Sequence, residues 1–98
     1  MSVGGKGVIS VLSNVLPKET SEMCHKFFSG DVKGAAEMQF KYFALTKALF
    51  SEVNPIPVKA AMAAMGFGED YVRLPLTVME DAHKEVLLEE MRKVCLDV

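Results

Sequence analysis

The segment Gly4–Val11 constrains the fold of this chain more than any other feature. It reads Gly-Gly-Lys-Gly-Val-Ile-Ser-Val, a short β-branched run that opens with glycines and hardly alternates apolar with polar residues. This pattern is typical of a parallel-sheet strand that is buried on both faces. No later segment offers a second strand that could pair with it. The sequence therefore predicts one strand that belongs to a larger sheet.

The composition is typical of one small globular domain. The chain has 98 residues, of which 50% are hydrophobic, and a formal net charge of -2, enough for a modest core. Its 11 Lys and Arg residues are scattered, so no positive stripe predicts a nucleic-acid partner. Apolar runs are interrupted well before the roughly 20 residues that span a bilayer, and the start lacks a secretory signal pattern. We therefore expect no membrane partner and a cytoplasmic location.

After the strand, the sequence predicts helices with clear start and stop residues. Pro17 suits the first turn of a helix that ends near Ser29, and Gly30 is its expected stop. Asp31 is the expected cap of a second helix that ends near Ser51. A strand followed at once by a helix is a β-α unit, so the chain begins with one such unit.

Two more helices complete the expected layout. One runs over 57–65 and stops at Gly66, and the last begins near Glu80. The apolar face of the last helix consists of Leu87, Leu88, Met91, Val94 and Cys95. Together with the second helix, this face supplies the only self-sufficient core. We therefore expect residues 31–98 to fold without residues 1–16.

Local features of these helices predict individual contacts. Gly34 weakens a helix by about 1 kcal/mol relative to alanine, and close approach of another backbone would explain its presence. Cys24 and Cys95 both fall on expected helices among apolar neighbours, so we interpret them as buried thiols rather than as a disulfide. Glu89 and Lys93 have the i, i+4 spacing of a favourable pair.

Candidate reactive residues do not form a recognisable catalytic or metal pattern. An amine nucleophile needs an apolar pocket that lowers its pKa, and the conceivable ones are Lys6, Lys18, Lys47 and Lys59. Lys59 stands out because two prolines precede it, but an ion-paired or solvent-reaching lysine is the favoured interpretation. His25 beside Cys24, and the distant His83, lack the spacing of metal ligands. No metal site is predicted.

Five short motifs follow one another along the chain. They are Gly-Gly-Lys-Gly-Val-Ile-Ser-Val at 4–11, Asn14-Val15 followed by Pro17-Lys18-Glu19, Ala48-Leu49-Phe50, Asn-Pro-Ile-Pro-Val-Lys at 54–59, and Arg73-Leu74-Pro75-Leu76-Thr77. In this order and spacing, over essentially the whole chain, the sequence resembles the dihydrodipicolinate synthase family. The wider superfamily of pyruvate-dependent aldolases shares the fold, but the motifs at 54–59 and 73–76 favour the synthase branch.

The resemblance implies a (β/α)8 barrel, a TIM barrel, with an added C-terminal helical domain. Residues 4–12 would form the eighth strand of that barrel, and residues 17–29 its eighth helix. The implied domains are 1–30, the end of the barrel, and 31–98, the helical domain. The fold class of the chain itself is therefore mainly α, with one β-α unit followed by helices.

The resemblance also implies the chemistry of the intact enzyme, which belongs to lysine biosynthesis. In that family a lysine on strand six forms a Schiff base with pyruvate, and the resulting enamine attacks aspartate semialdehyde; no cofactor is expected. That strand lies upstream of this chain, so the chain holds no catalytic residue and should be inactive alone. One contact is implied here, from the backbone carbonyl of Ile9 to pyruvate at the barrel mouth. This oxygen can accept a hydrogen bond but cannot act as the nucleophile.

The partners implied by the resemblance are the remainder of the same barrel and further copies of the intact enzyme, as a tetramer or dimer. Two alternatives remain at this point. The chain could be a free-standing helical scaffold or oligomerisation module, or the C-terminal part of another pyruvate-dependent aldolase such as N-acetylneuraminate lyase. The residues upstream of Met1 would distinguish these possibilities, because a barrel with a strand-six lysine is expected there only for an aldolase.

Overall fold

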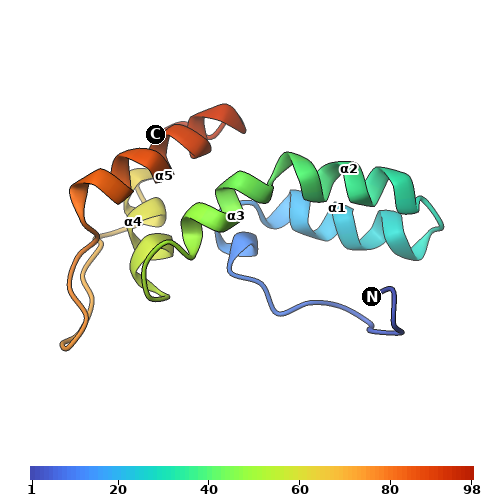
Figure 1. Ribbon diagram of the computed structural model, residues 1–98, viewed down its shortest axis with the longest axis horizontal. Coiled ribbons are helices and arrows are strands. Elements are labelled where there is room, and N and C mark those ends of the chain that lie inside the picture. Colours follow the sequence, from blue (N-terminus) through green and yellow to red (C-terminus); the bar gives the residue numbers. More distant parts are fainter.

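The computed structural model describes residues 1–98 as an elongated, wholly helical molecule of 42 × 26 × 20 Å. It contains five α-helices, one short 3₁₀ helix and no strand (Figure 1). The elements are η1 (Leu12–Asn14), α1 (Pro17–Phe28), α2 (Val32–Lys41), α3 (Phe43–Leu49), α4 (Ile56–Ala64) and α5 (Asp81–Lys93). The mainly α fold class is therefore confirmed. None of these helices combines the length and the apolar content that crossing a bilayer would require.

The expected strand at residues 4–12 is absent, which corrects the sequence prediction. Residues 5–10, which we call the arm, have no regular secondary structure, and η1 begins at Leu12. The arm runs below α1 in Figure 1 without a neighbouring extended segment. Val8 is 56% exposed and Ile9 is 109% exposed, rather than buried on both faces. The physical reason is that a strand needs hydrogen-bonding neighbours, and this chain supplies none.

Helix α1 has the start and stop predicted for it. Pro17 occupies its first turn, and Gly30 follows its end with a φ of +96°, a left-handed conformation that glycine adopts without steric cost. The Thr20 hydroxyl donates a hydrogen bond of 2.8 Å to the Leu16 carbonyl in the first turn. Thr20 is the one buried polar side chain of the molecule. Its hydroxyl is thus satisfied locally at the point where α1 joins the core.

Helix α2 is capped as expected, and the cap also explains Gly34. The Asp31 carboxylate accepts a hydrogen bond of 2.9 Å from the Gly34 backbone N–H. A Cβ at position 34 would collide with this same carboxylate, not with another backbone. The predicted close approach of a second backbone is therefore wrong. Glycine here makes room for the cap that starts its own helix.

The second helix of the sequence prediction is two helices in the structure. Helix α2 ends at Lys41 and α3 begins at Phe43, with the buried Tyr42 between them. The Tyr42 carbonyl accepts the Thr46 backbone N–H at 3.0 Å and the Thr46 hydroxyl at 2.9 Å. A threonine hydroxyl bonded four residues back bends a helix. The bond lies at this break, which apolar periodicity did not indicate.

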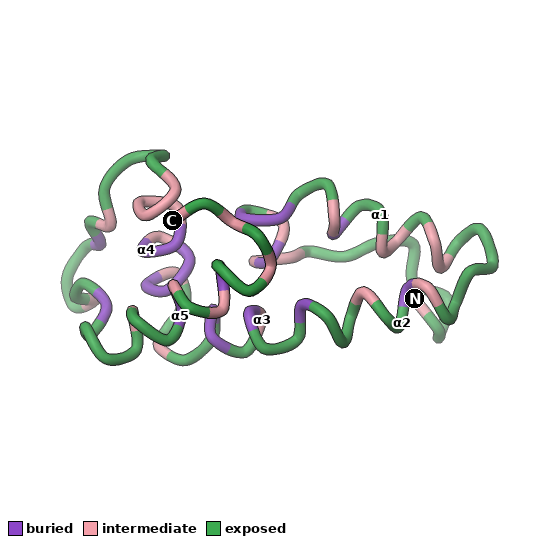
Figure 2. Tube along the Cα trace, turned by 90° about the horizontal axis from the view of Figure 1, so that it is seen from above, coloured by how far each residue is buried: buried purple, intermediate pink, exposed green.

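The main core lies where α3, α4, α5 and η1 meet (Figure 2). Its largest fully buried side chains are Leu45, Leu49, Pro57, Leu87 and Met91. The core also includes Leu12, Val15 and Leu16, from before α1. A core confined to residues 31–98 was therefore a wrong expectation, because the turn at 12–16 fills space that the later helices leave open.

Helix α5 buries most of its predicted face. Leu87 and Met91 have no exposed surface, and Leu88 and Val94 are partly buried against the core. Cys95 departs from the prediction: it is exposed and has a φ of +66°. The helix ends at Lys93, so the chain turns away before position 95 can reach the core. Cys24 is only partly buried. The interpretation of both as buried thiols is therefore wrong, although both are free.

Candidate functional site

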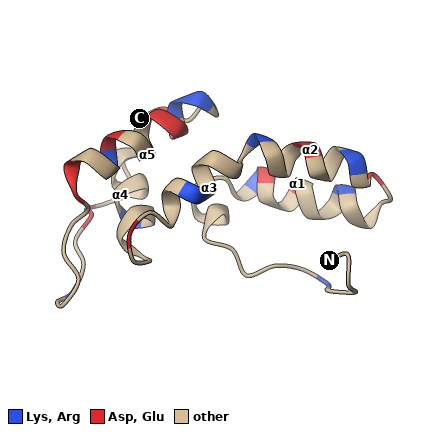
Figure 3. Cartoon of the chain, in the orientation of Figure 1, with Lys and Arg blue, Asp and Glu red and all other residues tan.

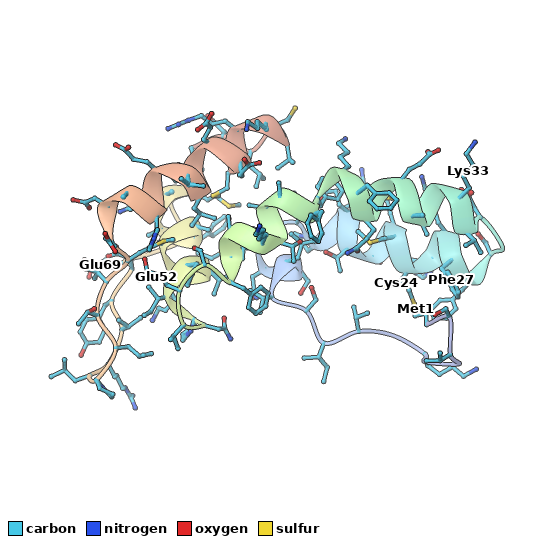
Figure 4. The ribbon with its side chains drawn as sticks, in the orientation of Figure 1. Met1, Cys24, Phe27, Lys33, Glu52 and Glu69 are labelled. Atoms are coloured by element: carbon cyan, nitrogen blue, oxygen red, sulfur yellow. The ribbon has the colours of Figure 1, made fainter.

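Ile9 lies on one side of a cleft between the arm and the helices α1, α2 and α3. The cleft has a volume of about 330 Å³ and is lined mainly by apolar side chains. Those that define it best are Val8, Ile9, Met23, Cys24, Thr46 and Phe50. Met1 also lines the cleft, and Figure 4 shows it close to Cys24. The start of the chain and the arm thus line the same cleft as residues of α1.

Two of the polar side chains that line this cleft are already engaged. The hydroxyls of Thr20 and Thr46 donate to the carbonyls of Leu16 and Tyr42. No Asp, Glu, His, Lys or Arg lines the cleft. General acid–base chemistry uses His, Glu, Asp, Lys, Tyr or Cys side chains within hydrogen-bond reach. Of these the cleft offers the Cys24 thiol alone, so it can receive an apolar surface but holds no acid–base pair.

The four candidate lysines lie on separate parts of the structure. Lys6 is on the arm, Lys18 on α1, Lys47 on α3 and Lys59 on α4. Lys18 pairs loosely with Glu22 at 3.9 Å on the surface of α1. Only Lys59 is partly buried, beside a cleft of about 440 Å³ that it shares with Asn54 and Glu69 among others. Polar neighbours of this kind do not form the desolvated pocket that an amine nucleophile needs.

The His, Cys and acidic residues do not gather into a metal centre, since no group of three or more lies close enough to share an ion. His83 contacts acidic residues other than the Asp81 and Glu85 that flank it in sequence. Its Nδ1 lies 3.0 Å from the Glu52 Oε2 and 3.7 Å from the Glu80 Oε2. Glu52 precedes His83 by 31 positions, so no spacing rule could have linked them. This contact is one that sequence reasoning missed.

Surface charge offers no second site. Helices α1, α2 and α5 carry both basic and acidic residues, whereas α3 and α4 carry a single lysine each, and Figure 3 shows no run of positive charge along a helix. This mixed pattern matches the formal net charge of -2. Recognition of nucleic acid requires a basic stripe or patch, and the helices present none.

A sequence model of the Dihydrodipicolinate synthetase family matches residues 1–94. The chain belongs to this family. Among curated relatives, the 4-hydroxy-tetrahydrodipicolinate synthase of Lachnoclostridium phytofermentans is 54% identical over 96 residues, which is 98% of this chain and 33% of the relative. The synthase of Thermotoga neapolitana is 48% identical over 93 residues, which is 95% of this chain and 32% of the relative.

Solved structures of the family superpose closely on this chain. The dihydrodipicolinate synthase of Thermotoga maritima is 46% identical, with a TM-score of 0.95 over 97% of this chain and 32% of its own. The synthase of Aquifex aeolicus is 41% identical, with a TM-score of 0.95 over 99% of this chain and 33% of its own. The chain therefore spans about a third of its relatives and corresponds to their C-terminal portion. The resemblance drawn from the five motifs is confirmed.

Proposed function

We propose that this chain supplies the eighth strand, the eighth helix and the C-terminal helical domain of a 4-hydroxy-tetrahydrodipicolinate synthase. The whole enzyme would join pyruvate to aspartate semialdehyde through a lysine Schiff base on strand six. The observation that carries the proposal is 54% identity to a synthase over 98% of this chain. The exposed arm supports it further, because the apolar residues Val8 and Ile9 remain largely exposed in this chain.

In this proposal the arm becomes a strand when the remainder of the barrel supplies its neighbours. Burial of apolar side chains contributes about 25 cal/mol per Å², so placing Val8 and Ile9 between barrel strands and helices favours assembly. The partner is the missing part of the same barrel, and the complete enzyme assembles as a tetramer or dimer. Barrel enzymes place their chemistry at the carboxyl ends of the strands, which is the end of the arm where Ile9 lies.

The role that we assign to Ile9 is to position pyruvate through its backbone carbonyl. The oxygen accepts a hydrogen bond from the substrate or from a water beside it, and it takes no part in the covalent step. The nucleophile is the strand-six lysine, which this chain lacks. The chain alone is therefore expected to bind no pyruvate covalently and to form no product.

Reconstitution tests this proposal directly. The 98-residue chain would be mixed with the N-terminal two thirds of the Lachnoclostridium phytofermentans synthase, and each part would be assayed alone as a control. Borohydride with pyruvate should trap an adduct only in the mixture, and mass spectrometry should place it on the lysine of the barrel fragment. An adduct on Lys6, Lys18, Lys47 or Lys59 would contradict the assignment.

The proposed role of the Ile9 carbonyl needs a test that separates backbone from side chain. In the reconstituted enzyme, Ile9→Ala should leave the KM for pyruvate almost unchanged, because the carbonyl remains. Replacing Ser10 by its α-hydroxy acid converts the Ile9 amide into an ester, whose carbonyl is a weaker acceptor. That change should raise the KM for pyruvate severalfold. An unchanged KM for the ester would remove Ile9 from the substrate site.

A further inference from the structure

The loop between α4 and α5 is fastened at both ends to neighbouring elements. We call residues 65–80 the connecting loop. Near its start, the Asp70 Oδ2 lies 3.7 Å from the Lys84 Nζ. At its end, the Glu52 Oε2 accepts a hydrogen bond of 3.0 Å from the Glu80 backbone N–H and also lies 3.0 Å from the His83 Nδ1. Glu52 belongs to the turn after α3 (Figure 4), so the first turn of α5 contacts both the loop and that turn.

The bond from Glu52 fills a gap at the start of α5. The first N–H groups of a helix have no partner within the helix, and a side chain usually caps them. Glu80 occupies the cap position but makes no side-chain cap bond. The Glu52 carboxylate instead bonds the N–H of this residue from 28 positions upstream. A negative charge at a helix N-terminus is also favoured by the helix dipole, and the Glu52 side chain is only 20% exposed.

The interior of the connecting loop has few buried side chains and few backbone hydrogen bonds, so the contacts at its two ends are what hold its shape. Only Val72 and Met79 are buried, whereas Leu74 at the tip is 85% exposed. Between residues 68 and 80, the one backbone hydrogen bond runs from the Leu76 N–H to the Arg73 carbonyl. Figure 1 shows the loop extending away from α4 and α5. Segments with few buried apolar contacts and few backbone bonds open most readily.

We propose that Glu52 and Asp70 form a two-point clasp on the first turn of α5, and that this clasp controls opening of the connecting loop. His83 and Lys84 are consecutive residues on α5. His83 contacts the Glu52 carboxylate, and Lys84 contacts the Asp70 carboxylate. Each contact holds the turn in the position that the other needs, so the two contacts are coupled. Release of the clasp frees the loop and the first turn of α5, while the core around Leu87 and Met91 stays packed.

Hydrogen–deuterium exchange followed by mass spectrometry tests the clasp on the 98-residue chain. Loss of a helix cap weakens the local structure enough to speed exchange about tenfold. We therefore expect Glu52→Ala to raise exchange about tenfold in peptides covering 70–84, with no change in α1 and α2. Glu69→Ala is the matched control, because it removes the same charge from a neighbouring exposed residue with no ion pair. Unchanged exchange in Glu52→Ala would overturn the proposal.

A second set of variants keeps the test informative if Glu52→Ala unfolds the chain. Glu52→Gln and Asp70→Asn retain the shape of each side chain but remove its charge. Because each contact supports the other, each single variant already weakens both contacts, so the double variant should speed exchange in peptides 70–84 by less than the product of the two single effects. A double variant that only multiplies the single effects would show two independent contacts, and the clasp would be wrong.

Discussion

The arm and helix α5 carry similar apolar residues in opposite environments. Ile9 on the arm is fully exposed at 109%, whereas Leu87 on α5 has no exposed surface. Helix α5 packs against α3 and α4, which this chain provides, but the arm has no neighbouring strand. The comparison shows that an apolar side chain is buried only where a neighbouring element packs against it. The chain supplies such partners for its C-terminal helices but not for the arm.

The largest expected effect on thermal stability comes from deleting N-terminal residues, because two deletions of different length separate the arm from the core. Removing residues 1–10 takes away the exposed arm and should leave a cooperative melt with helical circular dichroism. Removing residues 1–16 also takes Leu12, Val15 and Leu16 from the core. Each fully buried side chain of this type contributes about 1.5–3 kcal/mol, so the longer deletion should melt far lower or without cooperativity. Equal melting of both deletions would show that the turn at 12–16 is dispensable.

Single substitutions in the two regions should differ almost as clearly. Leu87→Ala leaves a cavity in the core and should lower the free energy of unfolding by about 2–5 kcal/mol. Ile9→Ala removes a side chain that touches mostly solvent, and should change it by less than about 0.5 kcal/mol. Urea unfolding followed by circular dichroism measures both. A large loss for Ile9→Ala would mean that the arm is packed in solution.

The cap of α2 provides a smaller, local test within the N-terminal region. Asp31→Ala removes the acceptor for the Gly34 N–H and should cost about 1 kcal/mol of unfolding free energy. The double variant Asp31→Ala with Gly34→Ala is the useful companion, because it also removes the carboxylate that a Cβ at 34 would meet. It should recover much of the loss, since alanine favours a helix by about 1 kcal/mol over glycine. No recovery would indicate another obstacle at position 34.

The smallest effect is expected at the exposed end of α5. The pKa of Lys93 is raised from 10.5 by its hydrogen bond to Glu90, then by the charges of Glu90 and Glu89. The pKa of Lys93 is higher in the folded chain than in the unfolded chain. The stabilisation of the folded state by charged Lys93 is therefore fully present below pH 10.5 and is lost as pH rises through the raised pKa. In an NMR titration, Glu90→Gln should lower the Lys93 pKa more than Glu89→Gln does. The reverse order would contradict the geometry, in which Glu90 is 3.1 Å away and Glu89 3.9 Å.

Much of the helical layout could be predicted because short-range chemistry sets it. Pro17 in the first turn of α1, the Asp31 cap and the glycines at 30 and 66 each act within a few residues. The break at Tyr42 could not be read from apolar periodicity, because the apolar faces of residues 32–49 continue across it. The motif at 54–59 identified the family, yet it did not indicate that Glu52 beside it reaches α5.

The sequence by itself determined the family and several helix starts and stops, because motifs, caps and stops are local properties of the chain. Only the tertiary structure decided that residues 12–16 complete the core, that Glu52 caps α5, and that Cys95 faces solvent. Those outcomes depend on contacts between residues far apart in sequence. The arm shows the same dependence: its residues follow the pattern predicted for a buried strand, but a strand forms only where neighbouring backbone completes its hydrogen bonds.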